Sequence, residues 1–150
     1  MVAEEARRRA LLATVHSAGF DVQYGAALGL AYAEDTGRTQ DLTEGLDKRF
    51  PEATIVQFNY LPTLGAKLAL NRGNASEALE TLRAAVPHEL GRTTFSDYIW
   101  NSLHPVFVRG EAYLAAHQGS NAPAEFQKIV DHRIQLVGYA YLGVIQRIGR

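Results

Sequence analysis

The stretch LNRGNASEAL, residues 70–79, decides the fold that this sequence predicts. Gly73 separates two segments in which apolar residues recur at helical rather than strand spacing. Asn74 is followed three residues later by Glu77, a pairing that resembles a capping box, in which side chains satisfy the free N–H groups of a helix's first turn. The stretch therefore predicts a helix, a tight turn and a second helix. Because the link is short, the two helices are expected to lie antiparallel.

Similar turns recur along the chain. LAAHQG at residues 114–119 closes a second hairpin of this kind, and AEDTG at residues 33–37 leads into an earlier one. The turns are about 40 residues apart, a spacing typical of repeat architectures. We expect one domain over residues 1–150, with about three hairpins plus a terminal helix. The expected helices lie near residues 4–18, 21–34, 38–50, 54–72, 75–86, 96–117, 121–132 and 134–148.

Two of the longest expected helices contain a proline, Pro62 and Pro105. Because proline lacks a backbone N–H, each is expected to mark the true first turn of its helix or a kink.

The bulk composition restricts the classes of function. The net charge is -1 and the charged residues are scattered, so neither nucleic acid nor a membrane surface is a predicted partner. The chain has no cysteine, which excludes disulfides and thiolate metal sites, and it has no run of about 20 apolar residues that would span a membrane. A cytoplasmic location is therefore expected.

No pattern of residues predicts catalysis. The five histidines show no pair at metal-ligand spacing along one helix. Adjacent carboxylates, such as Glu4 with Glu5, do not share a helix face and so do not predict an acid–base dyad. We expect no enzyme activity, no metal and no cofactor.

Small residues occur where helices of neighbouring segments should touch. In the third hairpin Gly110 and Tyr113 are followed by Ala122 and Phe126. The middle hairpin has an equivalent set, namely Ala66, Ala69, Gly73, Ala78, Leu82 and Ala85. This pattern fits the packing of helical-hairpin repeats.

Several stretches together resemble one family: KRFP (48–51), YLPT (60–63), PHELG (87–91), VRGEAYLAA (108–116) and EFQKIVDHR (125–133). They are similar to the tetratricopeptide region of large bacterial signalling proteins, notably those of acidobacteria. In that family the repeats follow a serine/threonine protein kinase domain or a winged-helix DNA-binding domain. The resemblance covers roughly residues 5 to 145, and it implies an all-α fold, an alpha-alpha superhelix of antiparallel helix hairpins in the manner of a tetratricopeptide solenoid.

The chain departs from the family's repeat pattern in two respects, and it also lacks the kinase motifs. His117 stands where the repeat usually has a glycine, and Arg150 falls inside what should be the first helix of a further hairpin, so a fragment of a longer protein is expected. The chain has no glycine-rich phosphate loop after a strand and no Asp-Phe-Gly sequence. Kinase activity is therefore not carried over, although a parent protein could carry a separate kinase domain.

The resemblance also predicts a binding face, because the first helices of such hairpins line a concave groove. Most of the aromatic rings in these helices are expected to belong to the core. By position in the repeat, eight residues should point into the groove and hold a peptide or a neighbouring domain: Tyr24, Tyr60, Thr63, Lys67, Asn71, His104, Phe107 and Glu111.

Two alternatives remain open. One is a structural spacer or a homodimer formed through the terminal helix, which is expected to expose Leu136, Tyr139, Leu142 and Ile145. The other is a small-molecule pocket among the aromatic residues, which would need a closed cavity.

Overall fold

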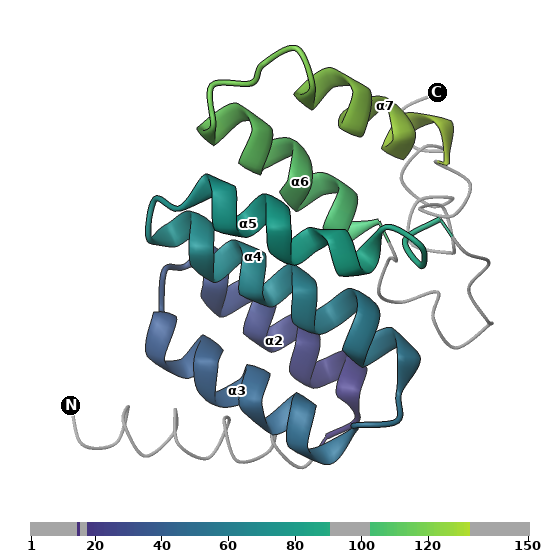
Figure 1. Ribbon diagram of the computed structural model, residues 1–150. Coiled ribbons are helices and arrows are strands. Elements are labelled where there is room, and N and C mark those ends of the chain that lie inside the picture. The colour runs from purple at the N-terminus through teal and green to yellow at the C-terminus, as the bar shows by residue number, and fades with distance from the viewer. Residues whose placement is uncertain (1–14, 16–17, 91–102, 133–150) are drawn as a thin grey trace, which may run out of the picture.

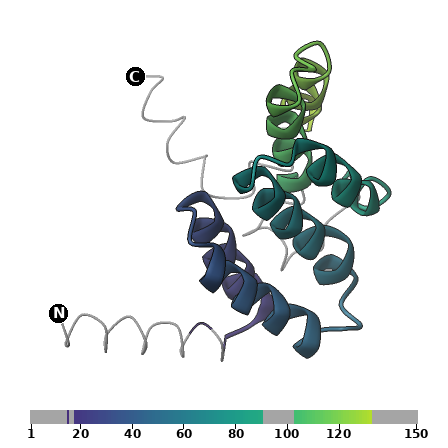
Figure 2. The same ribbon diagram turned by 60° about the vertical axis from the view of Figure 1, so that its left-hand side comes forward.

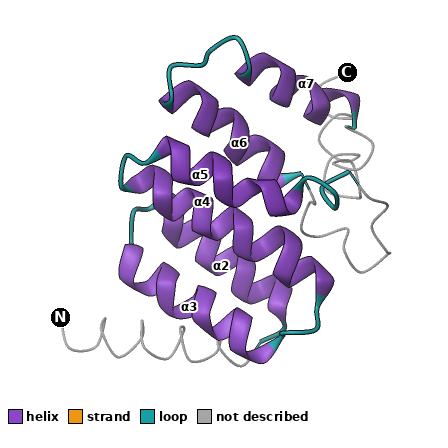
Figure 3. Cartoon of the chain, in the orientation of Figure 1, coloured by secondary structure: helices purple, strands orange, loops and turns teal. Residues whose placement is uncertain are grey.

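The computed structural model describes residues 15, 18–90 and 103–132, and every regular element in these ranges is helical (Figure 3). The α-helices are α2 (Phe20–Tyr32), α3 (Thr36–Arg49), α4 (Leu61–Asn71), α5 (Ala75–Thr81), α6 (His104–Ala115) and α7 (Ala122–Asp131). A π-helical turn, η1 (Val56–Tyr60), leads into α4, and a 3-10 turn, η2 (Leu82–Ala85), continues α5. The helices expected at 4–18 and 134–148, and the expected start of helix 96–117, lie outside the described residues.

The helices pair into three hairpins that follow one another through the molecule (Figure 1). Helix α2 packs on α3, α4 on α5, and α6 on α7, as expected from the short links. Each first helix also contacts the next first helix, so that α2, α4 and α6 lie side by side, and Figure 2 shows that the row of hairpins bends. The all-α prediction is confirmed for the described residues.

The turn that closes each hairpin has the same geometry every time. One residue adopts a left-handed backbone, and the N–H of the next residue bonds the carbonyl five residues back, as at many helix ends. The left-handed residues are Glu34 (φ 60°), Gly73 (φ 76°) and His117 (φ 57°). The hydrogen bonds run from Asp35 to Leu30 (3.0 Å), from Asn74 to Ala69 (2.9 Å) and from Gln118 to Tyr113 (2.8 Å). The repeat in the sequence is therefore also a repeat in the backbone.

Side-chain caps then start the second helix of the first two hairpins. Asp35 accepts a hydrogen bond from the Arg38 N–H at 3.2 Å, and Asn74 accepts one from the Glu77 N–H at 3.1 Å. The predicted capping box differs in its return bond, because the backbone N–H of Asn74 is already bonded within the turn. The Glu77 carboxylate instead accepts from the side-chain amide of Asn74 at 2.8 Å.

The two prolines are accommodated in different ways. Pro105 lies in the first turn of α6, where its missing N–H has no helical partner to lose. Pro62 lies just after η1, in which the N–H of Leu61 bonds the carbonyl of Val56, five residues back. A helical path thus continues past Pro62 because the hydrogen-bond register changes directly before it.

The core confirms the predicted packing of small residues except at Gly73, which is exposed in the turn and contacts no neighbouring helix. Ala66, Ala69, Ala78 and Leu82 form one buried cluster with residues of α6. At Gly110 a Cβ atom would overlap the ring of Phe126, so only glycine lets α7 approach α6 this closely. A second cluster, rich in leucine and tyrosine, fills the space between the first hairpin and η1–α4.

Candidate partner-binding face

One surface of the molecule is built from α2, α4 and α6, and we call it the inner face. Two hydrogen bonds cross it and join α2 directly to α6. The Tyr24 hydroxyl lies 2.9 Å from Nδ1 of His104, and the Tyr32 hydroxyl donates to Glu111 at 3.1 Å. Because both outer helices also pack on α4, this layer of helices curves toward the inner face. The pairs also show that α2 and α6 run in the same direction.

Stacked tyrosines form the floor of the inner face near the start of these helices. The rings of Tyr24 and Tyr60 lie parallel, with centroids 3.8 Å apart, and both residues are fully buried. Burial raises the pKa of Tyr24 above its usual value. The Tyr60 hydroxyl donates to Asp21 at 2.7 Å. These rings are core residues whose hydroxyls are engaged within the protein.

Hydrogen bonds also engage other polar residues of the inner face, Thr63 near the start of α4 and Asn71 at its end. Thr63 is buried and donates to the carbonyl of Asn59 at 2.6 Å, while the Asn71 amide donates to the carbonyl of Ala31 at 2.7 Å. Burial lowers the pKa of His104, so its imidazole is neutral near pH 7. Thr63, Asn71 and His104 therefore add no net charge to the inner face near pH 7.

A charged cluster lies nearer the ends of the same helices. Nζ of Lys67 is 3.3 Å from both carboxylate oxygens of Glu111 and 4.0 Å from the centre of the Tyr32 ring. The Lys67 side chain is only 12% exposed, whereas that of Glu111 is 29% exposed and Tyr32 is 45% exposed. Burial, together with the Glu111 charge, raises the pKa of Tyr32. The cluster thus presents a carboxylate and an aromatic ring outward and keeps the ammonium group below them.

The eight residues predicted for the groove lie on α2, η1, α4 and α6 with unequal exposure, and the ring of Phe107 also contacts that of Phe126 on α7, with centroids 5.8 Å apart. Tyr24, Tyr60 and Thr63 are buried; Lys67, Asn71, His104 and Glu111 are partly exposed; and Phe107 is exposed. Contact of these residues with a partner remains a prediction. Tyr32 was missed, although it follows Tyr24 by about two helical turns and so shares its side of α2.

Sequence reasoning also missed a buried ionic cluster on another side of α6. Arg109 bonds the carboxylates of both Glu89 and Glu125, with Nη1 at 2.9 Å and 3.0 Å respectively, and its second nitrogen also contacts Glu89 and the carbonyl of Leu82. Burial alone would lower the pKa of Arg109, but the two carboxylates raise it above its usual value. Glu89, Arg109 and Glu125 each lie in one of the sequence stretches that resemble the tetratricopeptide family. Their presence in those stretches was the only feature of the sequence that pointed to them.

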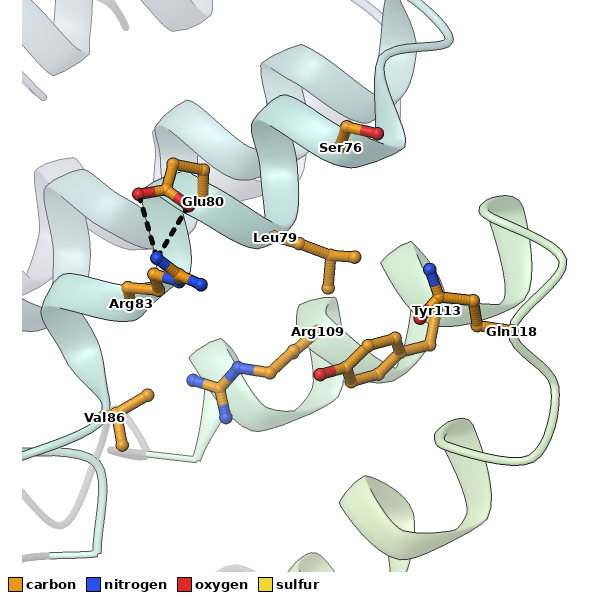
Figure 4. Close-up of a pocket in the computed structure, with 8 residues that line it drawn as sticks. All are labelled: Ser76, Leu79, Glu80, Arg83, Val86, Arg109, Tyr113 and Gln118. Carbon is orange, nitrogen blue, oxygen red and sulfur yellow. Dashed lines mark hydrogen bonds and ion pairs between the residues drawn. The ribbon is translucent and has the colours of Figure 1, made fainter.

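A cleft of about 380 Å³ opens beside this cluster, between α5 and α6 (Figure 4). Its lining is Ser76, Leu79, Glu80, Arg83, Val86, Arg109, Tyr113 and Gln118. At its rim the largely exposed Arg83 pairs with Glu80 at 3.2 Å, and its one buried charge, Arg109, is neutralised. Tyr113 is the one aromatic residue in this lining, so the cleft is not a pocket formed among the aromatic residues.

Among the residues that the structure describes, no group of three histidine or acidic side chains could hold a metal ion. No helix in the same ranges is long and apolar enough to cross a membrane. The fold thus defines the class as an all-helical protein of packed hairpins. Comparison with protein-family models, with curated proteins and with solved structures finds no match.

Proposed function

We propose that this protein is a non-catalytic protein–protein interaction scaffold of the tetratricopeptide type. It binds a peptide or a neighbouring domain on the inner face, within a cytoplasmic bacterial signalling protein, and its hairpins continue as a right-handed superhelix. The main support is the inner face itself, where exposed aromatic side chains surround a partly exposed carboxylate on a curved layer of parallel helices.

The recurring turn supports the repeat type. Left-handed residues at 34, 73 and 117 are spaced by about 40 residues, and each precedes a second helix that packs on the first. Gly110 and Phe126 make the close contact that the resemblance implies. Repeats of this kind bury a shared core and leave one continuous face for partners.

The chemistry of the face suits recognition of a polypeptide. Tyr32 and Phe107 offer large, rigid rings that are 45% and 43% exposed, and Tyr32 combines its ring with a hydroxyl. Lys67 and Glu111 add both signs of charge near the C-terminal ends of the helices that form the face. A peptide in such a groove would bury its apolar side chains on the rings and align its polar groups with the charged pair.

The test is a selection of random displayed peptides on the immobilised full chain. We expect enriched peptides that bind with micromolar affinity and whose affinity falls about ten-fold or more with Tyr32→Ala or Phe107→Ala. Val86→Ala is the matched control, because Val86 is 51% exposed but lies beside the cleft instead of on the inner face. Peptides that depend on Val86 and ignore Tyr32 and Phe107 would place the binding site elsewhere.

One observation favours the alternative of self-association. Leu114 on α6 and Val130 on α7 are 53% and 51% exposed, and both lie on the last hairpin of the described row. The terminal-helix face formed by Leu136, Tyr139, Leu142 and Ile145 lies outside the described residues. Light scattering during size-exclusion chromatography decides between the two functions: a dimer that dissociates with Leu114→Glu or Leu142→Glu would support self-association, and a monomer at all concentrations would exclude it.

A further inference from the structure

On the inner face, the carboxylate of Glu111 and the ring of Tyr32 are more exposed than the side chain of Lys67. This difference indicates which chemical groups a partner would present. The ammonium group of Lys67 lies under Glu111 and Tyr32, with its side chain 12% exposed. The carboxylate above it and the Tyr32 ring are two to four times more accessible. An approaching peptide therefore meets an anion and an aromatic face first, and both attract cations.

The helix ends strengthen this preference. Helices α2, α4 and α6 end at the same side of the inner face, as the Tyr32–Glu111 and Asn71–Ala31 hydrogen bonds show. None of these helices has a basic residue in its last turn. The C-terminal carbonyl groups of a helix carry a partial negative charge that falls off within about one turn. Three such ends, without basic residues of their own, favour a positive charge at this place.

Neighbouring charges do not reverse the field. Lys67 and Glu111, 3.3 Å apart, together carry no net charge, so the accessible carboxylate acts at contact range and not as a long-range field. Arg72, just after α4, is matched by Glu77 at 3.0 Å. Glu34, just after α2, is exposed and adds a negative charge at the same end.

Apolar residues flank the carboxylate on α6. Phe107 precedes Glu111 by four residues and Leu114 follows it by three, so both lie about one turn away on nearly the same side of the helix. They are 43% and 53% exposed. A ligand that reaches Glu111 with a cation can therefore bury apolar side chains on either side of it.

From this arrangement we infer that the partner of the inner face is a peptide segment carrying a lysine or arginine flanked by apolar residues. The basic side chain bonds Glu111 and lies against Tyr32, and the apolar side chains cover Phe107 and Leu114. The inference rests on the proposed function, because it names the partner chemistry of the same face.

The test extends the peptide selection to two chains in parallel, the wild type and Glu111→Gln. Peptides selected on the wild type should be enriched in lysine or arginine next to leucine, isoleucine or phenylalanine, and those selected on Glu111→Gln should lack the basic residue. For the best peptide, replacing its basic residue by glutamine should weaken binding about ten-fold, the effect of one partly desolvated ion pair. That loss should largely disappear on Glu111→Gln, as expected for two directly coupled groups.

Two further variants control the test. Glu80→Gln removes an exposed carboxylate of the cleft rim and should leave peptide affinity unchanged. Tyr32→Leu removes the aromatic ring while leaving the Lys67–Glu111 pair in place. It should lower the affinity for the basic peptide several-fold. Circular dichroism melting curves establish whether each variant is folded. If Glu111→Gln does not fold, the Tyr32→Leu variant still tests the inference.

The outcomes separate the inference from the proposed function. Enrichment of acidic peptides, or of basic peptides that bind Glu111→Gln equally well, would overturn the inference while leaving a peptide-binding scaffold intact. Retention of no peptide by either chain would overturn both.

Discussion

Two ionic clusters are built on the same helix, two residues apart, and they differ in almost every physical respect. Arg109 is paired with two carboxylates in the core, where the side chains of Arg109, Glu89 and Glu125 are 10% exposed or less. Glu111 is paired with a single lysine at the edge of the inner face and is 29% exposed. The first cluster is closed and fully paired, whereas the second leaves its anion accessible. The comparison teaches that burial and the number of partners, more than residue type, separate structural charges from those available for binding.

The largest expected change in stability follows from removing the cation of the buried Arg109 cluster. Arg109→Met would leave Glu89 buried without a cation and Glu125 with Lys128 alone, at 2.8 Å, and unpaired buried charge costs about 3–5 kcal/mol of unfolding free energy. Chemical denaturation measures this loss. Arg83→Met, which breaks a largely exposed pair, is the matched control and should change stability by less than about 0.5 kcal/mol. Equal effects of the two variants would contradict the distinction between closed and open clusters.

Gly110, the residue between the two clusters, offers a way to separate them. Gly110→Ala should cost about 1–3 kcal/mol, because the new methyl group meets the Phe126 ring and displaces α7. The displaced α7 carries Glu125, so the contact of Arg109 with Glu125 should lengthen while the inner face stays intact. A crystal structure of the variant, together with its unfolding free energy, checks both parts. A change confined to the inner face would contradict the expected coupling.

Removing the lysine of the exposed Lys67–Glu111 pair should lower the stability by less. Lys67→Met leaves Glu111 partly solvated, so we expect a loss of about 1 kcal/mol or less in unfolding free energy. The same denaturation assay applies, and added salt should reduce the difference between variant and wild type. A loss as large as that of Arg109→Met would mean that Glu111 is not accessible in solution.

The smallest expected effect concerns pH and the inner face alone. Burial lowers the pKa of His104 from its usual 6.5, so the unfolded chain binds a proton more readily than the folded protein does. The stability that depends on neutral His104 is therefore complete above pH about 6.5 and is lost as the pH falls toward the lower folded pKa. His104→Gln, which keeps a hydrogen-bonding group near Tyr24, should remove this part of the pH dependence. Melting temperatures of both chains at several pH values test it, and parallel curves would contradict it.

Much of the fold could be predicted because its signals are local. Turn residues, the Asn74–Glu77 pairing and the apolar spacing all act within a few residues, and the structure confirms the helices that they predict in the described ranges. The π-helical turn before Pro62 was not predicted. A proline in the sequence shows that one backbone hydrogen bond is missing, but it does not show how the backbone adjusts.

The candidate site was predictable only in part, because its chemistry depends on distances between hairpins. Repeat position assigned His104 and Glu111 to one face, yet it could not show that their hydrogen bonds to α2 would enclose Tyr24 while leaving Tyr32 exposed. The Arg109 cluster depends on side chains far apart in the sequence. Spacing within a helix carries no information about such partners.

The two hydrogen bonds between α2 and α6 have a consequence for how the array unfolds. Stacked hairpin repeats normally interact only with their nearest neighbours, so that one end can melt while the other stays folded. Here the first and third hairpins also bond each other, through Tyr24 with His104 and Tyr32 with Glu111. Unfolding of the first hairpin therefore also breaks hydrogen bonds of the third hairpin. As a result, the described part of the chain should unfold more cooperatively than a simple linear array.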